Sequence, residues 1–212
     1  MSNNNLRGFY GGTFDPIHQG HLQLALYVLH HCQLNQLELL PCHIPPHRTA
    51  PGSSSTHRAA MVRLAIAEHP GLVINELELA KQQPSYTVDT LRQLQQQYPQ
   101  DHLCFLLGMD SLCQFKSWFE YQQILQLAHL IVLERPGYQA TIGDAPALLA
   151  AHEVVDLEAL RQHKAGKILR LNNPMFDISA SQIRRQYQQN QQEADLQIPA
   201  VQQYIEQHQL YR

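Results

Sequence analysis

The densest group of chemically useful residues lies near the start of the chain, where residues 11–21 read GGTFDPIHQGH. Gly11 and Gly12 follow an expected strand and would let the backbone approach a ligand closely. His18 and His21 lie at the start of an expected helix, where free N–H groups and the helix dipole favour an anion. The string therefore predicts a site for the phosphates of a nucleotide. It matches neither a Walker A loop nor a GxGxxG fingerprint, which disfavours a kinase or a dehydrogenase.

Residues 178–184, ISASQIR, form a second candidate segment near the end of the chain. Ser179 or Ser181 can cap a helix there, and Arg184 in its first turns can reach the same phosphates. Taken alone, the segment is more simply explained by a capping serine and a solvent-exposed arginine. Its combination with the first string favours phosphate binding. Asp15, within the first string, is expected to shape the turn rather than to take part in chemistry.

Short apolar runs alternate with amphipathic helical stretches along the chain. The expected strands span residues 6–10, 37–40, 72–75, 103–107, 127–133 and 167–171. The expected helices span residues 22–29, 56–69, 88–98, 181–191 and 199–207. This alternation predicts an α/β fold with a parallel sheet, right-handed crossovers and helices on both faces. Ligands of such sheets bind beyond the carboxyl ends of the strands. We expect one domain over residues 1–212, with residues 178–212 as its C-terminal helical part.

The composition narrows the class of protein. With 212 residues, 44% of them hydrophobic, the chain is long enough to bury a core without disulfides or metal. The net charge of −3 and the pI of about 6.5 predict no nucleic-acid partner and no membrane partner. The longest apolar runs have only strand length, and the four cysteines show no CxxC spacing. We therefore expect a cytoplasmic protein with no metal held by its own side chains.

The two strings resemble the HxGH and ISSTxIR signatures of the nucleotidylyltransferase superfamily. Further segments narrow this resemblance to the nicotinate-nucleotide adenylyltransferase family: PPHR at 45–48, PSYT at 84–87, GMDS at 108–111, WFEY at 118–121, RPGY at 135–138 and LYR at 210–212. The resemblance covers about residues 6–212, with all motifs in the family's order. It implies a Rossmann-like nucleotidylyltransferase fold, in which helices flank a central parallel sheet and a small helical part ends the chain.

The resemblance implies transfer of the adenylyl group of ATP to nicotinate mononucleotide, giving nicotinate adenine dinucleotide and pyrophosphate in NAD biosynthesis. Mg²⁺ would be bound mainly through ATP. The attacking group is then a phosphate monoester, which is largely dianionic near pH 7 because its second pKa is about 6. Such a reaction needs alignment and charge cancellation rather than a general base or a covalent nucleophile.

Carried over residue by residue, the resemblance gives three sets of expected site residues. The expected catalytic residues are His18, His21 and Arg184. The expected ATP-binding residues are Gly11, Gly12, Thr13, Phe14, His18, Gly20, His21, Gly108, Asp110, Ile178, Ser181 and Arg184. The expected substrate-binding residues are Arg48, Tyr86, Thr87, Trp118, Phe119 and Arg135.

Several roles on the substrate side have two interpretations. Trp118 would stack on the nicotinate ring, or serve as a core or lid aromatic. Main-chain amides near Thr87 and Phe119 would hold the nicotinate carboxylate, which favours the acid over the neutral amide. Asp110 would accept a hydrogen bond from a ribose hydroxyl, or cap a helix.

The residues expected to contact the phosphates also have two interpretations. Arg48 and Arg135 would meet phosphates, or face solvent. Cys42 stands where relatives often carry asparagine, so a contact to the substrate phosphate is lost there or shifts to His43.

Other functions compete with this one. The same chemistry on nicotinamide mononucleotide is the near alternative, whereas the PSYT and WFEY segments disfavour phosphopantetheine as acceptor. A non-catalytic module that senses ATP would be expected to have lost His18, His21 or Arg184, and all three are present. A nucleic-acid-binding protein would need a basic surface. A homo-oligomer is compatible with the sequence.

Overall fold

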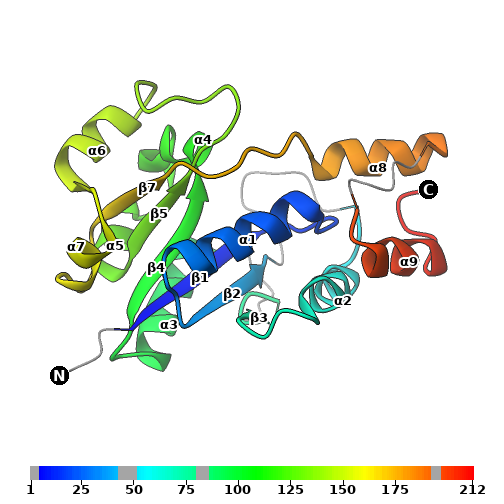
Figure 1. The fold of residues 1–212 in the computed structure, drawn as a ribbon, viewed down its shortest axis with the longest axis horizontal. Coiled ribbons are helices and arrows are strands. Elements are labelled where there is room, and N and C mark those ends of the chain that lie inside the picture. Colours follow the sequence, from blue (N-terminus) through cyan, green and yellow to red (C-terminus); the bar gives the residue numbers. More distant parts are fainter. Residues whose placement is uncertain (1–4, 43–51, 80–85, 192–196) are drawn as a thin grey trace.

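A parallel sheet forms the centre of the computed structural model, which describes residues 5–42, 52–79, 86–191 and 197–212. Within these ranges seven strands form one sheet in the order β3-β2-β1-β4-β5-β7-β6, and each neighbouring pair is parallel (Figure 1). The strands are β1 (Leu6–Gly12), β2 (Gln36–Pro41), β3 (Leu72–Ile74), β4 (His102–Gly108), β5 (His129–Leu133), β6 (Glu153–Val154) and β7 (Ile168–Leu171).

Helices cover both faces of this sheet. They are α1 (Gln19–His31), α2 (Ser55–Ile66), α3 (Thr87–Gln97), α4 (Met109–Leu112), the 3₁₀ helix η1 (Phe115–Ser117), α5 (Tyr121–Leu127), α6 (Ala145–His152), α7 (Leu157–Arg161), α8 (Ala180–Gln189) and α9 (Pro199–Gln207). Side chains of α1, α2 and α7 join one buried cluster, and those of α3, α5 and α6 join the other. Helices α8 and α9 lie at one end of the molecule, where α9 packs against α2 (Figure 1).

Side chains of the central strands alternate between the two buried clusters. In β4, Leu103, Phe105 and Leu107 enter the α3 side, whereas Cys104 and Leu106 enter the α1 side. Successive side chains of a strand point to opposite faces, and a parallel sheet covered on both faces buries both. This is why the central strands read as continuous apolar runs rather than as alternating ones.

The predicted fold class is confirmed, and so are all six predicted strands and five predicted helices, within a few residues. One boundary was wrong: the strand predicted over residues 127–133 begins at His129, because Leu127 is the last residue of α5. The short elements α4, η1, α5, α6, β6 and α7 were not predicted. Helices this short depend on tertiary packing rather than on their own periodicity. The division into domains stays a prediction.

His129, at the start of β5, is a buried titratable group remote from the carboxyl ends of the strands. Its Nδ1 accepts the Lys167 N–H at 3.1 Å, and its Nε2 donates to the His163 carbonyl at 2.9 Å. The neutral ring with its proton on Nε2 satisfies both contacts. Burial lowers the pKa of His129 to about 4.

We expect His129 to make the fold sensitive to acid. An unfolded histidine titrates near pH 6.5, so between about pH 6.5 and about pH 4 the unfolded chain binds more protons than the folded one. The free energy of unfolding should therefore fall as the pH falls through this window, by up to about 3 kcal/mol from this residue. Urea unfolding at several pH values should give a shallower acid slope for His129→Gln than for the wild type. The exposed His30 offers a control, His30→Gln, which should keep the wild-type slope; equal slopes for all three proteins would contradict the assignment.

Candidate active site

The carboxyl ends of β1, β4 and β5 open into a cleft of about 970 Å³. Every predicted site residue within the described ranges lines it: Gly11, Gly12, Thr13, Phe14, His18, Gly20, His21, Tyr86, Thr87, Gly108, Asp110, Trp118, Phe119, Arg135, Ile178, Ser181 and Arg184. Arg48 and His43 lie outside the described residues. The structure thus brings together residues from six separate sequence motifs, although the roles assigned to them stay predictions.

His18 and His21 stand face to face at the start of α1. Their ring centroids are 3.8 Å apart with 34° between the ring planes, and His18 is the residue immediately before the helix. His18 is 5% exposed. The Nδ1 atoms of both rings are buried and have no hydrogen-bond partner among the described residues. Buried polar atoms are usually paired, so two unpaired ring nitrogens at one turn are not explained by packing alone.

Burial favours the neutral form of both imidazoles when no ligand is bound. It lowers the pKa of His18 to about 4, with a smaller contribution from Arg135. It lowers the pKa of His21 well below the ordinary value, and His18 and Arg135 lower it further. An anion bound between these rings and the start of α1 would act in the opposite direction.

The paired glycines of β1 are required by aromatic rings rather than by a ligand alone. A Cβ at Gly11 would lie 3.1 Å from the Phe105 ring, and one at Gly12 would lie 2.8 Å from the Phe14 ring. Phe14 itself has a left-handed backbone (φ 49°), and its ring meets His21 edge-on with centroids 5.2 Å apart. Gly12 therefore makes room for the Phe14 ring that packs against His21, and Gly11 makes room for Phe105.

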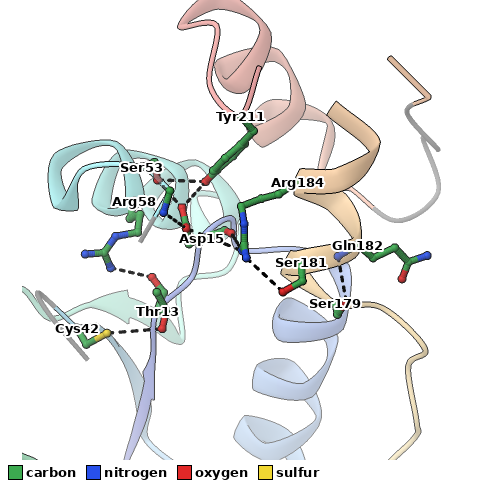
Figure 2. A network of polar contacts seen from close by, with 11 residues as sticks. Thr13, Asp15, Cys42, Ser53, Arg58, Ser179, Ser181, Gln182, Arg184 and Tyr211 are labelled. Carbon is green, nitrogen blue, oxygen red and sulfur yellow. Dashed lines mark hydrogen bonds and ion pairs between the residues drawn. The ribbon is translucent and has the colours of Figure 1, made fainter. Parts of the chain in front are cut away.

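Arg184 reaches the same region from the first turns of α8. Its Nη1 donates to the Asp15 carbonyl at 2.6 Å, and its Nη2 donates to Ser181 Oγ at 3.2 Å (Figure 2). Ser179 caps α8, because its hydroxyl accepts the Gln182 N–H at 3.1 Å. Of the two serines considered from the sequence, Ser179 is therefore the cap and Ser181 is the partner of Arg184.

Asp110 and Arg135 form a charged pair on the opposite wall. Asp110 Oδ1 lies 3.5 Å from Arg135 Nε, and Asp110 is not a helix cap, because Gly108 occupies that position of α4. A Cβ at Gly108 would lie 2.3 Å from Asp110 Oδ1, so a side chain at this position would force the carboxylate to move. The side chain of Arg135 is half-exposed, so it both faces solvent and borders the cleft.

Asn173 fixes the backbone beside Arg135 and was missed from the sequence. Its Oδ1 accepts the Glu134 N–H at 2.7 Å, and its Nδ2 donates to the Pro174 carbonyl at 3.0 Å. The amide thereby joins the end of β5 to residues 173–181, which line the cleft continuously up to α8. This irregular segment has no periodicity, and the only sequence signal was its position directly before the ISASQIR string.

Aromatic side chains line the remaining wall. Trp118 packs at a tilt against Phe115, with ring centroids 5.3 Å apart, and also lines the cleft. Phe119 is half-exposed and lies 4.9 Å from the Tyr86 ring. Trp118 therefore touches the core and the cleft together, which is compatible with both interpretations of its role. Thr87 begins α3 in the same wall.

Cys42 lies at the floor of the cleft, just after β2. Its Sγ is 3.8 Å from Thr13 Oγ1, and burial raises the pKa of its thiol. A neutral thiol is a poor donor for a phosphate, and whether the expected phosphate contact is lost here or shifts to His43 stays a prediction.

Comparison with known proteins identifies the family. Residues 9–186 match the model of the cytidylyltransferase-like family, so the chain belongs to this family of nucleotidyltransferases. A probable nicotinate-nucleotide adenylyltransferase of Pseudoalteromonas atlantica is 41% identical over 213 residues, which cover 99% of this chain and 97% of that protein. One of Aeromonas salmonicida is 45% identical over 206 residues, covering 97% and 96%. The chain therefore belongs to the nicotinate-nucleotide adenylyltransferases, as the motifs predicted.

Solved structures of low identity share the fold. One is a Plasmodium falciparum nicotinic acid mononucleotide adenylyltransferase complexed with NaAD, with a TM-score of 0.74 and 20% identity over 98% of this chain and 97% of that one. A putative nicotinate-nucleotide adenylyltransferase of Vibrio parahaemolyticus gives a TM-score of 0.67 and 15% identity, over 98% and 96%. Among the described residues, none of the helices has the length and apolar character needed to span a membrane.

We expect the two cleft histidines to take up protons when an anion binds beside them. Because burial lowers the pKa of His18 to about 4 when no ligand is bound, a bound anion should raise this pKa and shift binding in favour of lower pH. Sulfate suits the test, since it stays a dianion throughout and adds no titration of its own. Imidazole NMR signals followed from pH 8 to pH 5 should show a higher pKa for His18 and His21 with sulfate than without. Unchanged titration curves at saturating sulfate would exclude an anion site at these rings.

Proposed function

We propose that this chain transfers the adenylyl group of ATP to nicotinate mononucleotide, which forms nicotinate adenine dinucleotide and pyrophosphate in the cytoplasmic synthesis of NAD. The observation that carries the proposal is the pair of buried, unsatisfied imidazoles at the start of α1, in one cleft with Arg184 and Trp118. Membership in the nicotinate-nucleotide adenylyltransferase family supports the same choice.

The reaction exchanges one phosphoester linkage for another. An oxygen of the nicotinate mononucleotide phosphate forms a bond to the α-phosphorus of ATP, and the bond from that phosphorus to the β-phosphate oxygen breaks. The acceptor oxygen is already unprotonated, so no general base is needed. The protein's task is to align the two phosphates and to offset the negative charge that gathers between them.

In this proposal three groups meet the phosphates of ATP. His18 and His21 bind through imidazole nitrogens, and the free N–H groups of α1 add the helix dipole. Arg184 supplies the permanent positive charge. Gly11, Gly12, Thr13, Phe14 and Gly20 shape this wall, and Ile178, Ser181, Gly108 and Asp110 complete the ATP side, with Asp110 placed for a ribose hydroxyl.

Mg²⁺ is proposed to enter with ATP and to be held mainly by its phosphates. The side chains at the start of α1 and on α8 are imidazole and guanidinium groups, which suit phosphate oxygens rather than a hard cation. Within the described ranges no group of three or more histidine, cysteine or acidic side chains is arranged to hold a metal ion. When bound, the ion offsets charge on the phosphates.

The acceptor is proposed to occupy the aromatic wall. Trp118 stacks on the nicotinate ring, and main-chain amides near Thr87 and Phe119 hold its carboxylate. Tyr86 closes this side with Phe119, since their rings are already in contact. Arg135, together with Arg48, meets phosphate groups.

A paired assay tests the proposal. Purified protein with ATP and Mg²⁺ receives either nicotinate mononucleotide or nicotinamide mononucleotide, and dinucleotide and pyrophosphate are followed by chromatography. We expect strong preference for the acid, because a site built of N–H donors accepts a carboxylate and opposes an amide N–H. Equal use of the amide would contradict the acceptor assignment alone. Absence of any dinucleotide would overturn the reaction and favour a module that only senses ATP.

Two substitutions should separate transition-state stabilisation from ATP binding. His21→Ala should lower kcat by about two orders of magnitude or more while ATP still binds, because the imidazole acts on the transferring phosphoryl group. Arg184→Ala should weaken ATP binding and turnover together. Steady-state kinetics and calorimetric titration with ATP measure both. A His21→Ala enzyme with near-normal kcat would remove His21 from the mechanism, and an unaltered Arg184→Ala enzyme would do the same for Arg184.

A further inference from the structure

The turn between β1 and α1 holds a buried carboxylate to which the proposed reaction gives no role. Asp15 is 3% exposed. Its Oδ2 accepts the Gly52 N–H, and its Oδ1 accepts the hydroxyls of Ser53 and Tyr211, all at 2.6 Å (Figure 2). Hydrogen bonds to an ionised carboxylate are short and strong. The expectation that Asp15 shapes the turn therefore agrees with its contacts, but its donors come from two distant segments.

Arg184 lies close to the main-chain carbonyl of Asp15 but farther from its carboxylate. Arg184 Nη1 donates to the main-chain carbonyl of Asp15 at 2.6 Å, yet it stays 3.9 Å from the carboxylate Oδ2. The carboxylate is thus satisfied by neutral donors, and the guanidinium is satisfied by a neutral carbonyl and by Ser181. Within the described part of the chain, no carboxylate lies closer to Arg184 than Asp15 at 3.9 Å. The Arg184 side chain lines the cleft and is therefore available to a ligand there.

Tyr211 connects these two groups. It follows α9, is 9% exposed, and its ring lies 6.3 Å from that of Tyr187 on α8, the helix that carries Arg184. Burial and the neighbouring Asp15 charge raise the pKa of the Tyr211 hydroxyl. The hydroxyl therefore keeps its proton and remains a donor to Asp15 Oδ1 at any working pH.

We infer that Tyr211 is a positioning residue for ATP: its hydroxyl holds the Asp15 carboxylate away from Arg184 and so keeps the guanidinium available to the phosphates. Without this hydroxyl, Oδ1 loses one of its two donors, and a buried carboxylate short of donors turns to a nearby cation. Arg184 is that cation, 3.9 Å away. A closer pair would draw the guanidinium toward Asp15 and compete with ATP. The inference rests on the proposed function, in which Arg184 meets ATP.

Tyr211→Phe tests this directly, because it removes the hydroxyl and keeps the ring. Binding of α,β-methylene-ATP with Mg²⁺, measured by calorimetry without any acceptor, should weaken by about tenfold. The KM for ATP should rise by a similar factor, while kcat and the KM for nicotinate mononucleotide change less than about twofold. A loss of structure alone would not separate the two KM values in this way.

Two further variants make the result specific. Ser53→Ala removes the other hydroxyl from the same carboxylate oxygen, and it should weaken binding of the analogue as Tyr211→Phe does. Tyr187→Phe is the matched control: the Tyr187 hydroxyl is buried and donates to Gln197 Oε1 at 2.6 Å, with no bond to Asp15. Its removal should lower the melting temperature but leave binding of the analogue within about twofold of the wild type.

The outcomes separate the two hypotheses. Unchanged analogue binding in both Tyr211→Phe and Ser53→Ala, or equal weakening in Tyr211→Phe and Tyr187→Phe, overturns the positioning role. A wild-type protein that binds the analogue but makes no dinucleotide overturns the proposed reaction, and the positioning role is then still decided by analogue binding. A wild-type protein that does not bind the analogue overturns both.

Discussion

Between β1 and β4 the order of the parallel sheet reverses, and the cleft lies at this point. Connections that leave the two central strands run toward opposite sides, so the carboxyl ends of β1 and β4 cannot be covered by a crossover. The backbone there is open to a ligand, and the helix that follows β1 begins at its edge. Gly11 and Gly12 end one strand and Gly108 ends the other, and each is fixed by a neighbouring side chain that a Cβ would displace.

Buried hydrogen bonds connect segments that are distant in the sequence around this cleft. Asp15 alone joins the turn after β1 to Gly52, Ser53 and Tyr211, and its carbonyl joins α8 through Arg184. On the other side, the Asn173 amide joins the end of β5 to the segment that leads into α8. Each of these bonds would be costly to leave unmade in the interior. The cleft is therefore held by few contacts of long sequence separation, rather than by the local preferences of any one element.

Features with a local sequence pattern could be predicted, whereas features that depend on contacts between distant segments could not. Central strands such as residues 103–107 and helices such as α1 were predictable, since burial on two faces or on one face leaves a periodic pattern. The two strings around His18 and Arg184 were predictable as parts of one site, and both line the same cleft, whereas phosphate binding there stays a prediction. Three features were not predictable, because each depends on contacts between segments that are distant in the sequence and share no local pattern. They are the hydrogen bonds of Asn173 to the end of β5, the short helices α4 to α7, and the hydrogen bond of Tyr211 to Asp15. The sequence does not distinguish Ser179 from Ser181 as the helix cap, because either can begin a helix, and the hydrogen bond from the Gln182 N–H shows that Ser179 does so.

The electrostatics of the cleft bear on how a chain of net charge −3 could bind a polyanion selectively. A cluster of permanent cations would attract any phosphate-rich polymer, whereas burial lowers the pKa of the two imidazoles and favours their neutral form when no ligand is bound. In the proposed reaction they offer nitrogen atoms to a ligand bound beside them, and they gain charge when a neighbouring anion makes protonation favourable. Restoring the pKa of His18 from about 4 to its ordinary value corresponds to about 3 kcal/mol, which must come from the bound ligand. In the proposed reaction, the phosphates therefore bind strongly only when they lie against the start of α1, where they can raise the pKa of the histidines. Arg184 is then the permanent positive charge, and its position decides where the phosphates lie.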